Sequence, residues 1–174
     1  GFYLNIGKPE TIERLILSLD PTCIDPKQII PHCKEHNLIT AYIFINTNST
    51  LQSFVNPLRL LRKTLLAQEE PKAQKFVAYK LLWYLRLCIR GQTFPSGRIL
   101  EEYFPWAIAN ISNWLIKEDH LEMLIKIDAT VTLKVMWEFF ENVKAAEVFE
   151  KQASGAPSFG EFFAKLEEVC KGNS

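Results

Sequence analysis

The sequence predicts an all-α fold, more specifically an α-solenoid of stacked antiparallel helix pairs. Apolar residues recur at helical spacing along most of the chain, and the alternation of apolar and polar residues typical of strands is scarce. Prolines and glycines interrupt this pattern at short intervals, so helix pairs take roughly 30–45 residues each, a repeat length typical of α-solenoids. A compact orthogonal bundle stays open as an alternative, because no exact sequence repeat is visible.

Length and composition favour a single globular unit. The chain has 174 residues, about one domain, and 48% of them are hydrophobic, which is enough for a sizeable core. No apolar run approaches the ~20 residues needed to span a bilayer. The four cysteines are widely scattered, which favours free thiols over a disulfide framework. The sequence begins at Gly1 without a signal-peptide pattern, which we interpret as a fragment of a longer chain.

The N-terminal part predicts four helices, over residues 9–19, 26–36, 38–46 and 52–67. Asp20 and Pro21 end the first helix, because a proline disfavours helical geometry at the residue before it. Asp25 followed by Pro26 is typical of a helix start, since the carboxylate can cap the helix and proline is tolerated in its first turn. Pro57 marks a restart within the fourth helix.

A long central helix is predicted to follow a short polar link at residues 68–72. One face carries apolar side chains at helical spacing, namely Ala78, Leu81, Leu82, Leu85, Cys88 and Ile89. The opposite side is also partly apolar, because Phe76, Trp83 and Leu87 lie there among basic residues. A helix that is apolar on two sides is usually covered by neighbours on both. We therefore expect this helix to be the middle layer of the stack, with Leu85 in the core.

The central helix is predicted to end in a tight turn that leads to the next helix. Gly91 can take the left-handed conformation that closes a helix, and Pro95 prevents simple continuation. We expect four residues to be structural in this turn, with the phenylalanine tucked into the stack: Gly91, Phe94, Pro95 and Gly97. Ser96 is then placed to cap the next helix through its hydroxyl.

The C-terminal part predicts a short helix over residues 97–104, its continuation beyond Pro105 to about residue 116, and a brief helix around residues 121–125. Asp128 caps a further helix, in which we expect five side chains to face inward: Leu133, Val135, Met136, Phe139 and Phe140. The predicted organisation is a solenoid segment over residues 1–151, a linker or loop over 152–158, and a terminal helix over 159–174 that packs on the same domain.

Charge is distributed unevenly, although the net formal charge is zero. Residues 51–100 hold nine Lys/Arg against two Asp/Glu, and residues 101–174 hold seven against thirteen. A basic middle third is compatible with acidic lipid, RNA or an acidic protein partner. The simpler interpretation is that neighbouring helices of opposite sign neutralise each other, or that the charges form a solvated face.

Four side chains are the candidate partner contacts. Arg86 and Arg90 lie one turn apart on the basic flank of the central helix, where they repel each other until an acidic group approaches. That acidic group can belong to a partner or to residues 101–174. Trp106 and Trp114 lie two turns apart on nearly one face, so we expect them to form an exposed ridge. In contrast, we expect the other two tryptophans, Trp83 and Trp137, to be core residues.

No residue pattern indicates an active site, a cofactor site or a metal site. His32 and His36 share a helix face and can hold a metal, yet we find no acidic third ligand on that face, and Cys33 belongs to the apolar stripe. Glu101 and Glu102 are adjacent, so they point about 100° apart on a helix and cannot act as a carboxylate pair. Phosphate-binding glycine loops and hydrolase motifs are missing from the sequence. We expect a protein that binds rather than catalyses.

Four stretches resemble the central helical region of the vacuolar protein sorting-associated protein 8 family, large subunits specific to the CORVET endosomal tethering complex. The stretches are Leu19–Asn46, Phe54–Leu58, Tyr79–Ile99 and, more weakly, Leu124–Phe140. The segment in which a helix leads into the sequence GQTFPSG is the most specific of them. The family combines a clathrin-heavy-chain-like α-solenoid with an N-terminal β-propeller and a C-terminal RING-type zinc finger, and neither of these two parts is represented in this sequence.

The resemblance implies a non-catalytic cytoplasmic scaffold, peripheral on early endosomes, that acts in Rab-dependent vesicle fusion and endosome-to-vacuole or lysosome transport. The implied partners are other tethering-complex subunits, and a Rab GTPase through the full-length protein. Membrane association is then indirect, and no nucleic acid is expected. Two alternatives stay open: a related lysosomal-tether or coat subunit, and a helical-repeat adaptor that binds RNA or acidic lipid through the basic middle third.

Overall fold

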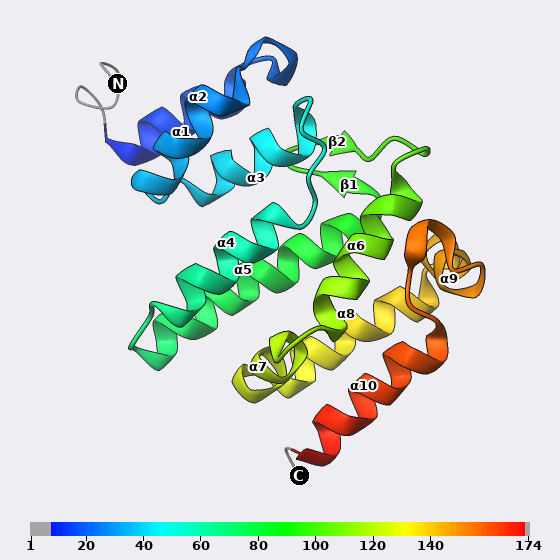
Figure 1. Cartoon of the computed structure of the whole chain (residues 1–174). Coiled ribbons are helices and arrows are strands. Elements are labelled where there is room, and N and C mark those ends of the chain that lie inside the picture. The colour runs from blue at the N-terminus through cyan, green and yellow to red at the C-terminus, as the bar shows by residue number, and fades with distance from the viewer. Residues whose placement is uncertain (1–7, 173–174) are drawn as a thin grey trace.

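A computed structural model describes residues 8–172, which are almost entirely helical (Figure 1). The α-helices within this range are α1 (Pro9–Ser18), α2 (Pro26–Glu35), α3 (Ile39–Asn48), α4 (Asn56–Leu66), α5 (Pro71–Ile89), α6 (Phe104–Ile116), α7 (His120–Ile127), α8 (Ala129–Glu141), α9 (Val143–Glu150) and α10 (Phe159–Gly172). Short 3-10 turns, η2 (Pro21–Cys23) and η3 (Ala153–Gly155), and two strands, β1 (Gln92–Thr93) and β2 (Gly97–Arg98), complete the regular structure. The all-α prediction is confirmed.

The helices stack in sequence order, with α1 and α2 at one end and α10 at the other (Figure 1). α1 and α2 pack on α3, α4 packs along α5, and α5 in turn contacts α8. This arrangement confirms the predicted α-solenoid. No helix within residues 8–172 combines the length and the apolar character that a membrane span requires.

The core consists of two apolar clusters that meet at α3. Ile39 and Ile43 of α3 belong to the larger cluster, which continues to α10, whereas Tyr42 and Ile45 face the smaller cluster of α1 and α2. α3 is therefore covered on both sides. The central helix, now α5, is a middle layer of the stack as expected, since it packs on α4 and on α8. Its flank with Phe76 and Trp83, however, faces solvent rather than a neighbouring helix. Leu85 of α5 is fully buried, as predicted.

The stretch that follows α5 forms a β-hairpin, and the predicted helix over residues 97–104 is wrong. Gly91 closes α5 at φ +70°, and the antiparallel strands pair Thr93 with Gly97. A polar residue of α3 holds the hairpin, since the Asn48 amide donates to the Phe94 carbonyl over 2.9 Å. The Thr93 hydroxyl donates to the Asn48 side-chain oxygen, also over 2.9 Å. These two hydrogen bonds attach the hairpin, which contains the predicted structural turn, to helix α3.

Helix caps explain most of the boundaries. The carboxylates of Asp25 and Asp128 accept backbone N–H groups in the first turns of α2 and α8, as predicted. Ser96 lies in the hairpin and does not cap α6, which begins at Phe104 instead. Asn142 separates α8 from α9, because its side chain accepts the Ala145 N–H and caps the start of α9.

Residues 152–158 form a packed loop rather than an extended connection. The Asn113 amide of α6 donates to the Gly155 carbonyl over 2.8 Å, and Ala156 is buried. The loop returns the chain so that α10 lies along α8, where Phe162 is fully buried against Phe139. In this arrangement α10 contributes to the same core as the helices before it.

Candidate functional site

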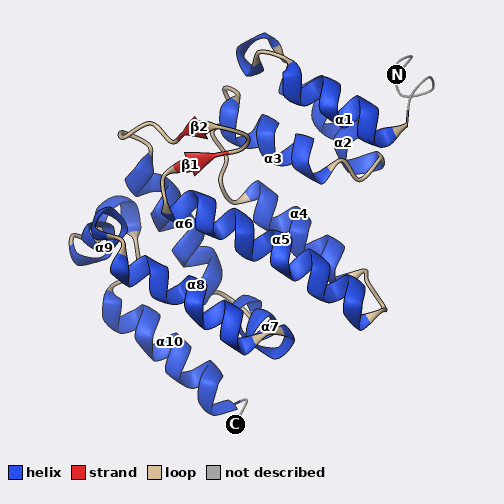
Figure 2. Cartoon of the chain, turned by 180° about the vertical axis from the view of Figure 1, so that it is seen from behind, coloured by secondary structure: helices blue, strands red, loops and turns tan. Residues whose placement is uncertain are grey.

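Two neighbouring helices, α5 and α8, lie in the middle of the stack (Figure 2), and both carry exposed large aromatic and apolar side chains. We call this surface the α5–α8 face, and its apolar members are Phe76, Tyr79, Trp83, Leu133 and Trp137. Phe76 and Trp137 are 62% and 56% exposed. Within residues 8–172, the α5–α8 face therefore presents residue types that dominate protein interfaces and that the rest of the fold covers only in part.

Helical spacing explains why the aromatic side chains of α5 share a face. Phe76, Tyr79 and Trp83 follow one another at intervals of three and four residues, which places them along one side of the helix. Leu85, on the other side, lies in the core. The expectation that Trp83 and Trp137 are core residues is wrong, and Leu133 also points outward rather than inward. Only the arrangement of neighbouring helices decides which of two apolar sides is covered.

Ion pairs join the two helices along the α5–α8 face. Arg86 Nε lies 2.8 Å from Glu138 Oε1, and Arg90 lies 3.6 Å from the other oxygen of the same carboxylate. At the opposite end, Lys75 lies 3.8 Å from Asp128. Because the first turn of α8 meets the first turns of α5, and the last turn meets the last, the two helices run parallel.

Asp128 combines three kinds of contact at the start of α8. Its carboxylate accepts a hydrogen bond of 2.7 Å from the Tyr79 hydroxyl and one from the Val131 N–H. These bonds, that of Tyr79 first, lower the pKa of Asp128 below its ordinary value, and Lys75 acts in the same direction. A carboxylate held in its charged form ties the two helices together at neutral pH.

Internal pairing neutralises part of the basic middle third. Four of its cations, including Arg62, which lies 2.9 Å from Asp119, pair with acidic residues of the C-terminal part. Three lysines around the α5–α8 face make no ion pair within residues 8–172: Lys72, Lys80 and Lys134. The Lys80 ammonium lies 4.7 Å from the centre of the Phe76 ring. The face therefore keeps a surplus of positive charge beside its aromatic side chains.

The predicted ridge of Trp106 and Trp114 does not exist as an exposed surface. Trp106 is 42% exposed and packs edge-on against Phe54. Trp114 is only 6% exposed, and its ring stacks on His120 with a centroid distance of 3.9 Å. His120 Nδ1 lies 2.6 Å from the Trp114 carbonyl, to which its N–H donates. The prediction is wrong for Trp114, which is a core residue.

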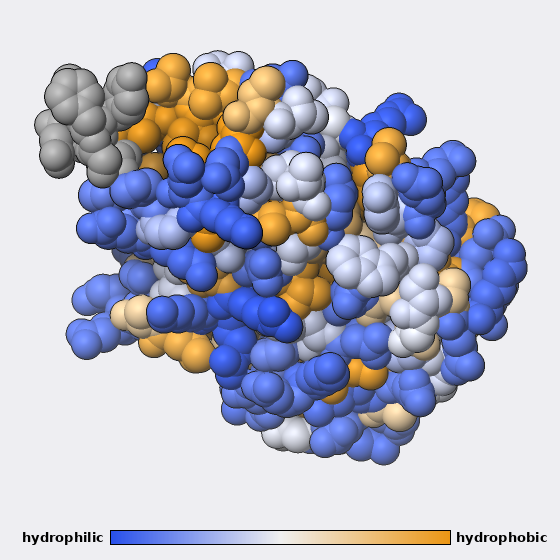
Figure 3. Space-filling view, turned by 45° about the horizontal axis from the view of Figure 1, so that its top comes forward, coloured by the Kyte–Doolittle hydropathy of each residue, from blue (hydrophilic) through white to orange (hydrophobic). Residues whose placement is uncertain are grey.

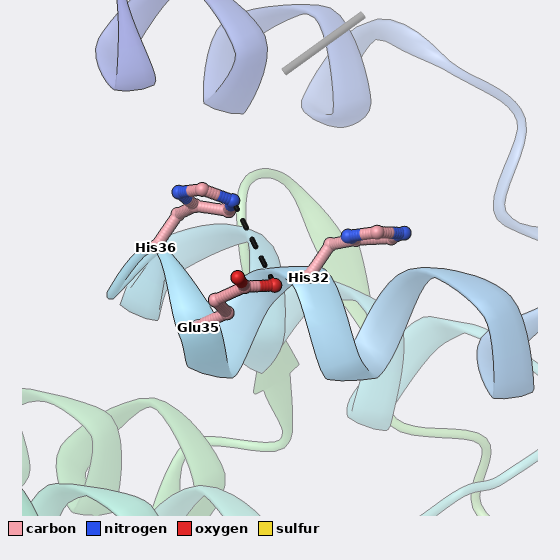
Figure 4. A group of neighbouring side chains, drawn as sticks. All are labelled: His32, Glu35 and His36. Carbon is pink, nitrogen blue, oxygen red and sulfur yellow. Dashed lines mark ion pairs between the residues drawn. The ribbon is translucent and has the colours of Figure 1, made fainter. Parts of the chain in front are cut away.

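A histidine cluster lies on α2 (Figure 4). The expectation that no acidic ligand shares the face of His32 and His36 is wrong, since the Glu35 carboxylate lies 3.9 Å from His36 Nε2. One potential ligand atom from each residue lies within 4.8 Å of the others. Zinc with bonds of about 2.1 Å requires ligand atoms ~3.4 Å apart and a fourth ligand. The cluster is looser than a formed zinc site.

An open cleft of about 660 Å³ lies between the hairpin and α9. Buried apolar side chains of Ile99, Phe104 and Val148 line it, and charged side chains surround it. Lys144 and Glu101 pair across 3.6 Å, and both side chains are mostly exposed. Such a mixed apolar and charged lining suits a bound peptide or apolar group.

Apolar side chains also gather at the N-terminal end of the stack, over α1 and α2 (Figure 3). Leu15 and Leu19 are about half exposed there. This end differs from the α5–α8 face, because an end of a solenoid exposes the side on which a further repeat stacks.

A protein-family model and three curated relatives match this chain, and all four point to the same family. Residues 1–123 match the protein-family model described as Vps8 central TPR. The vacuolar protein sorting-associated protein 8 homologs of Mus musculus and Homo sapiens are 25% and 24% identical over 163 residues, 82% of this chain. The Drosophila melanogaster homolog is 28% identical over 140 residues, 74% of this chain. The chain spans about 11% of the length of these relatives, and no solved structure matches it.

Proposed function

Because the chain belongs to the Vps8 family, with residues 1–123 matching its central TPR region, we propose that it is a non-catalytic scaffold segment of a membrane-tethering complex. The named relatives are vacuolar protein sorting proteins, which supports a role in transport to the vacuole or lysosome. The finer proposal is a CORVET-like tether that acts in Rab-dependent fusion at early endosomes. The chain is then cytoplasmic and joins the membrane indirectly, through other subunits.

The observation that carries this proposal is the exposed α5–α8 face on a solenoid. An α-solenoid offers an extended surface that is suited to binding other proteins. Phe76 and Trp137 are each more than half exposed, and large exposed apolar patches are typical of interaction sites. Burial also raises the pKa of the Cys88 thiol to about 12, so this cysteine is not a nucleophile at neutral pH.

Three of the four candidate contacts are retained in the proposal. Arg86 and Arg90 are each about half exposed and share one carboxylate, so a partner can approach both guanidinium groups. Trp106 is retained because it is exposed, and Trp114 is not retained. We propose that these residues contact other tethering subunits. A Rab GTPase is proposed as a partner of the full-length protein.

A binding experiment tests the function. The immobilised chain is incubated with each purified tethering subunit, and separately with early-endosomal Rabs loaded with GTP or GDP. We expect at least one subunit to be retained, and retention to fall when Arg86→Glu and Arg90→Glu are combined. Circular dichroism of the variant must show an unchanged helical spectrum. Retention of no subunit by the folded chain contradicts the proposal.

The RNA and lipid alternative is separated by its salt dependence. Binding to phosphate groups releases counterions, so affinity for RNA or anionic vesicles falls steeply as salt is raised. We expect neither to bind tightly at 150 mM salt, because four cations of the basic third pair internally. Tight binding at low salt that disappears at 200 mM salt, without subunit binding, favours the alternative.

A further inference from the structure

The α5–α8 face occupies a lateral position that stacking does not cover. α5 and α8 lie in the middle of the solenoid (Figure 2), and Phe76, Tyr79, Trp83 and Trp137 on them are exposed. Repeats that join either end contact α1 or α10, not this face. The exposed aromatic side chains are therefore available to a separate molecule.

The spacing of the aromatic side chains fits a helical ligand. Phe76, Tyr79 and Trp83 extend over about 10 Å of α5, given a rise of 1.5 Å per residue. Trp137 adds a fourth large side chain from the parallel helix α8. Amphipathic helices bind such surfaces through apolar anchors that repeat at three and four residues. Tryptophan, tyrosine and arginine, which recur here, are also the residues most enriched among interface hot spots.

The charge of the face indicates an acidic ligand. Lys72, Lys80 and Lys134 make no ion pair within the described part of the chain, residues 8–172. Arg86 and Arg90 both pair with the single negative charge of Glu138, so this group of three side chains carries a net positive charge. An acidic ligand supplies the missing charge, and the exposed apolar rings provide the contact area.

Nucleic acid fits the face less well than a protein helix. Glu141 is exposed on α8, where it accepts a 2.7 Å hydrogen bond from the Trp137 indole. Together with Asp128 and Glu138 it places three carboxylates among the cations, and these repel a phosphate backbone. The carboxylates of a protein helix can instead be spaced to meet the lysines alone.

We propose that the α5–α8 face binds an acidic amphipathic helix of a partner protein. This inference rests on the proposed function, since the partner helix is that of a tethering subunit. The apolar side of the helix lies against Phe76, Tyr79, Trp83 and Trp137. Its carboxylates meet Lys80 of α5 and Lys134 of α8.

The probe is an 18-residue peptide, held helical by a hydrocarbon staple on its polar side, with leucines at three- and four-residue spacing and glutamates elsewhere. Fluorescence anisotropy measures its binding to the full chain. We expect micromolar affinity for this peptide. A shuffled peptide of the same composition, and a version with lysine in place of glutamate, are expected to bind at least tenfold more weakly.

Matched variants locate the binding surface. Phe76→Ser combined with Trp137→Ser removes exposed rings, and we expect it to weaken peptide binding at least tenfold. Tyr103→Ser is the control, because Tyr103 is an exposed aromatic residue that precedes α6 and is not a member of the α5–α8 face. For charge, Lys80→Glu with Lys134→Glu is compared with Lys63→Glu, an exposed lysine of α4. The controls are expected to change affinity less than twofold.

The outcomes separate this inference from the proposed function. The inference is overturned if the peptide does not bind, if the shuffled peptide binds equally, or if Tyr103→Ser weakens binding as much as the double variant. RNA that displaces the peptide, or a self-association that the double variant abolishes, also overturns it. If the wild type and the variant with Phe76→Ser and Trp137→Ser retain subunits equally, the proposed function stands. The inference is then overturned, because the subunits bind at another surface. Peptide binding without subunit retention contradicts the function alone.

Discussion

Arg86 and Glu138 join the last turns of two parallel helices through a contact of 2.8 Å between Nε and Oε1. The partners are 52 positions apart in the sequence, so this contact depends on the stacking of α5 beside α8. Arg90 approaches the same carboxylate, which is only 23% exposed. One acidic side chain therefore relieves the repulsion between two arginines that lie one turn apart.

Reversing the charge of Arg86 should lower the free energy of unfolding. Arg86→Glu places two carboxylates together, and we expect a loss of about 0.5–1 kcal/mol, because the arginine is half exposed and solvent screens the pair. Adding Glu138→Arg should restore part of that loss. Urea denaturation of the wild type, both single variants and the double variant measures the coupling. Additive changes would show that the pair contributes nothing to stability.

Leu85→Ala should destabilise the chain by about 2–5 kcal/mol. Leu85 is fully buried in the larger core cluster, so truncation removes apolar contacts and leaves a cavity. Leu87→Ala on the same helix is the control, since Leu87 is only partly buried. The midpoint of thermal or urea unfolding measures both. Equal small losses for the two variants would place Leu85 outside a tightly packed core.

Local signals predicted the helices and their caps, whereas long-range contacts decided the features that were missed. Asp25 and Asp128 cap helices through neighbours two or three residues away, which a sequence displays directly. The hairpin depends instead on Asn48, a residue 45 positions before Thr93. Likewise, the exposure of Trp137 depends on which helices lie beside α8. The candidate site was only half predictable, because its arginines were identified and its aromatic surface was assigned to the core.

Gly97 and Gly91 should both resist substitution, for different reasons. A Cβ at Gly97 collides with the Thr93 hydroxyl. We therefore expect Gly97→Ala to break the hydrogen bond between the Thr93 hydroxyl and the Asn48 side chain. At Gly91 the added Cβ has ordinary room, 3.7 Å from Phe104, but the backbone has φ +70°. Gly91→Val should therefore cost about 1 kcal/mol or more through its backbone alone. Differential scanning calorimetry checks both, and an unchanged melting temperature for either variant refutes the corresponding account.

Two of the four cysteines should react with a thiol reagent in the folded chain. Cys23 and Cys170 are exposed, whereas Cys33 and Cys88 are buried. Burial raises the pKa of each buried thiol to about 12, so little thiolate is present at pH 8. Ellman's reagent should release two equivalents rapidly and two more only after unfolding in urea. Rapid release of four would contradict the buried positions, and Cys23→Ser with Cys170→Ser should abolish the rapid phase.

Asp128 should make stability depend on pH in the acidic range. Its pKa in the folded chain lies below the ordinary value of about 3.9, chiefly because the Tyr79 hydroxyl donates to the carboxylate. The folded state therefore binds this proton less readily than the unfolded state. The contribution of Asp128 to the free energy of unfolding is fully present above pH ~4 and is lost as pH falls through the folded pKa.

Asp128→Asn keeps an oxygen that can cap α8 but removes the titration. Between pH 6 and pH 3 the melting temperature of the wild type should fall more steeply than that of Asp128→Asn, with Tyr79→Phe intermediate. Asp119, whose pKa is also lowered, here by the Arg62 hydrogen bond, contributes equally in all three proteins, so parallel curves would refute the role of Asp128.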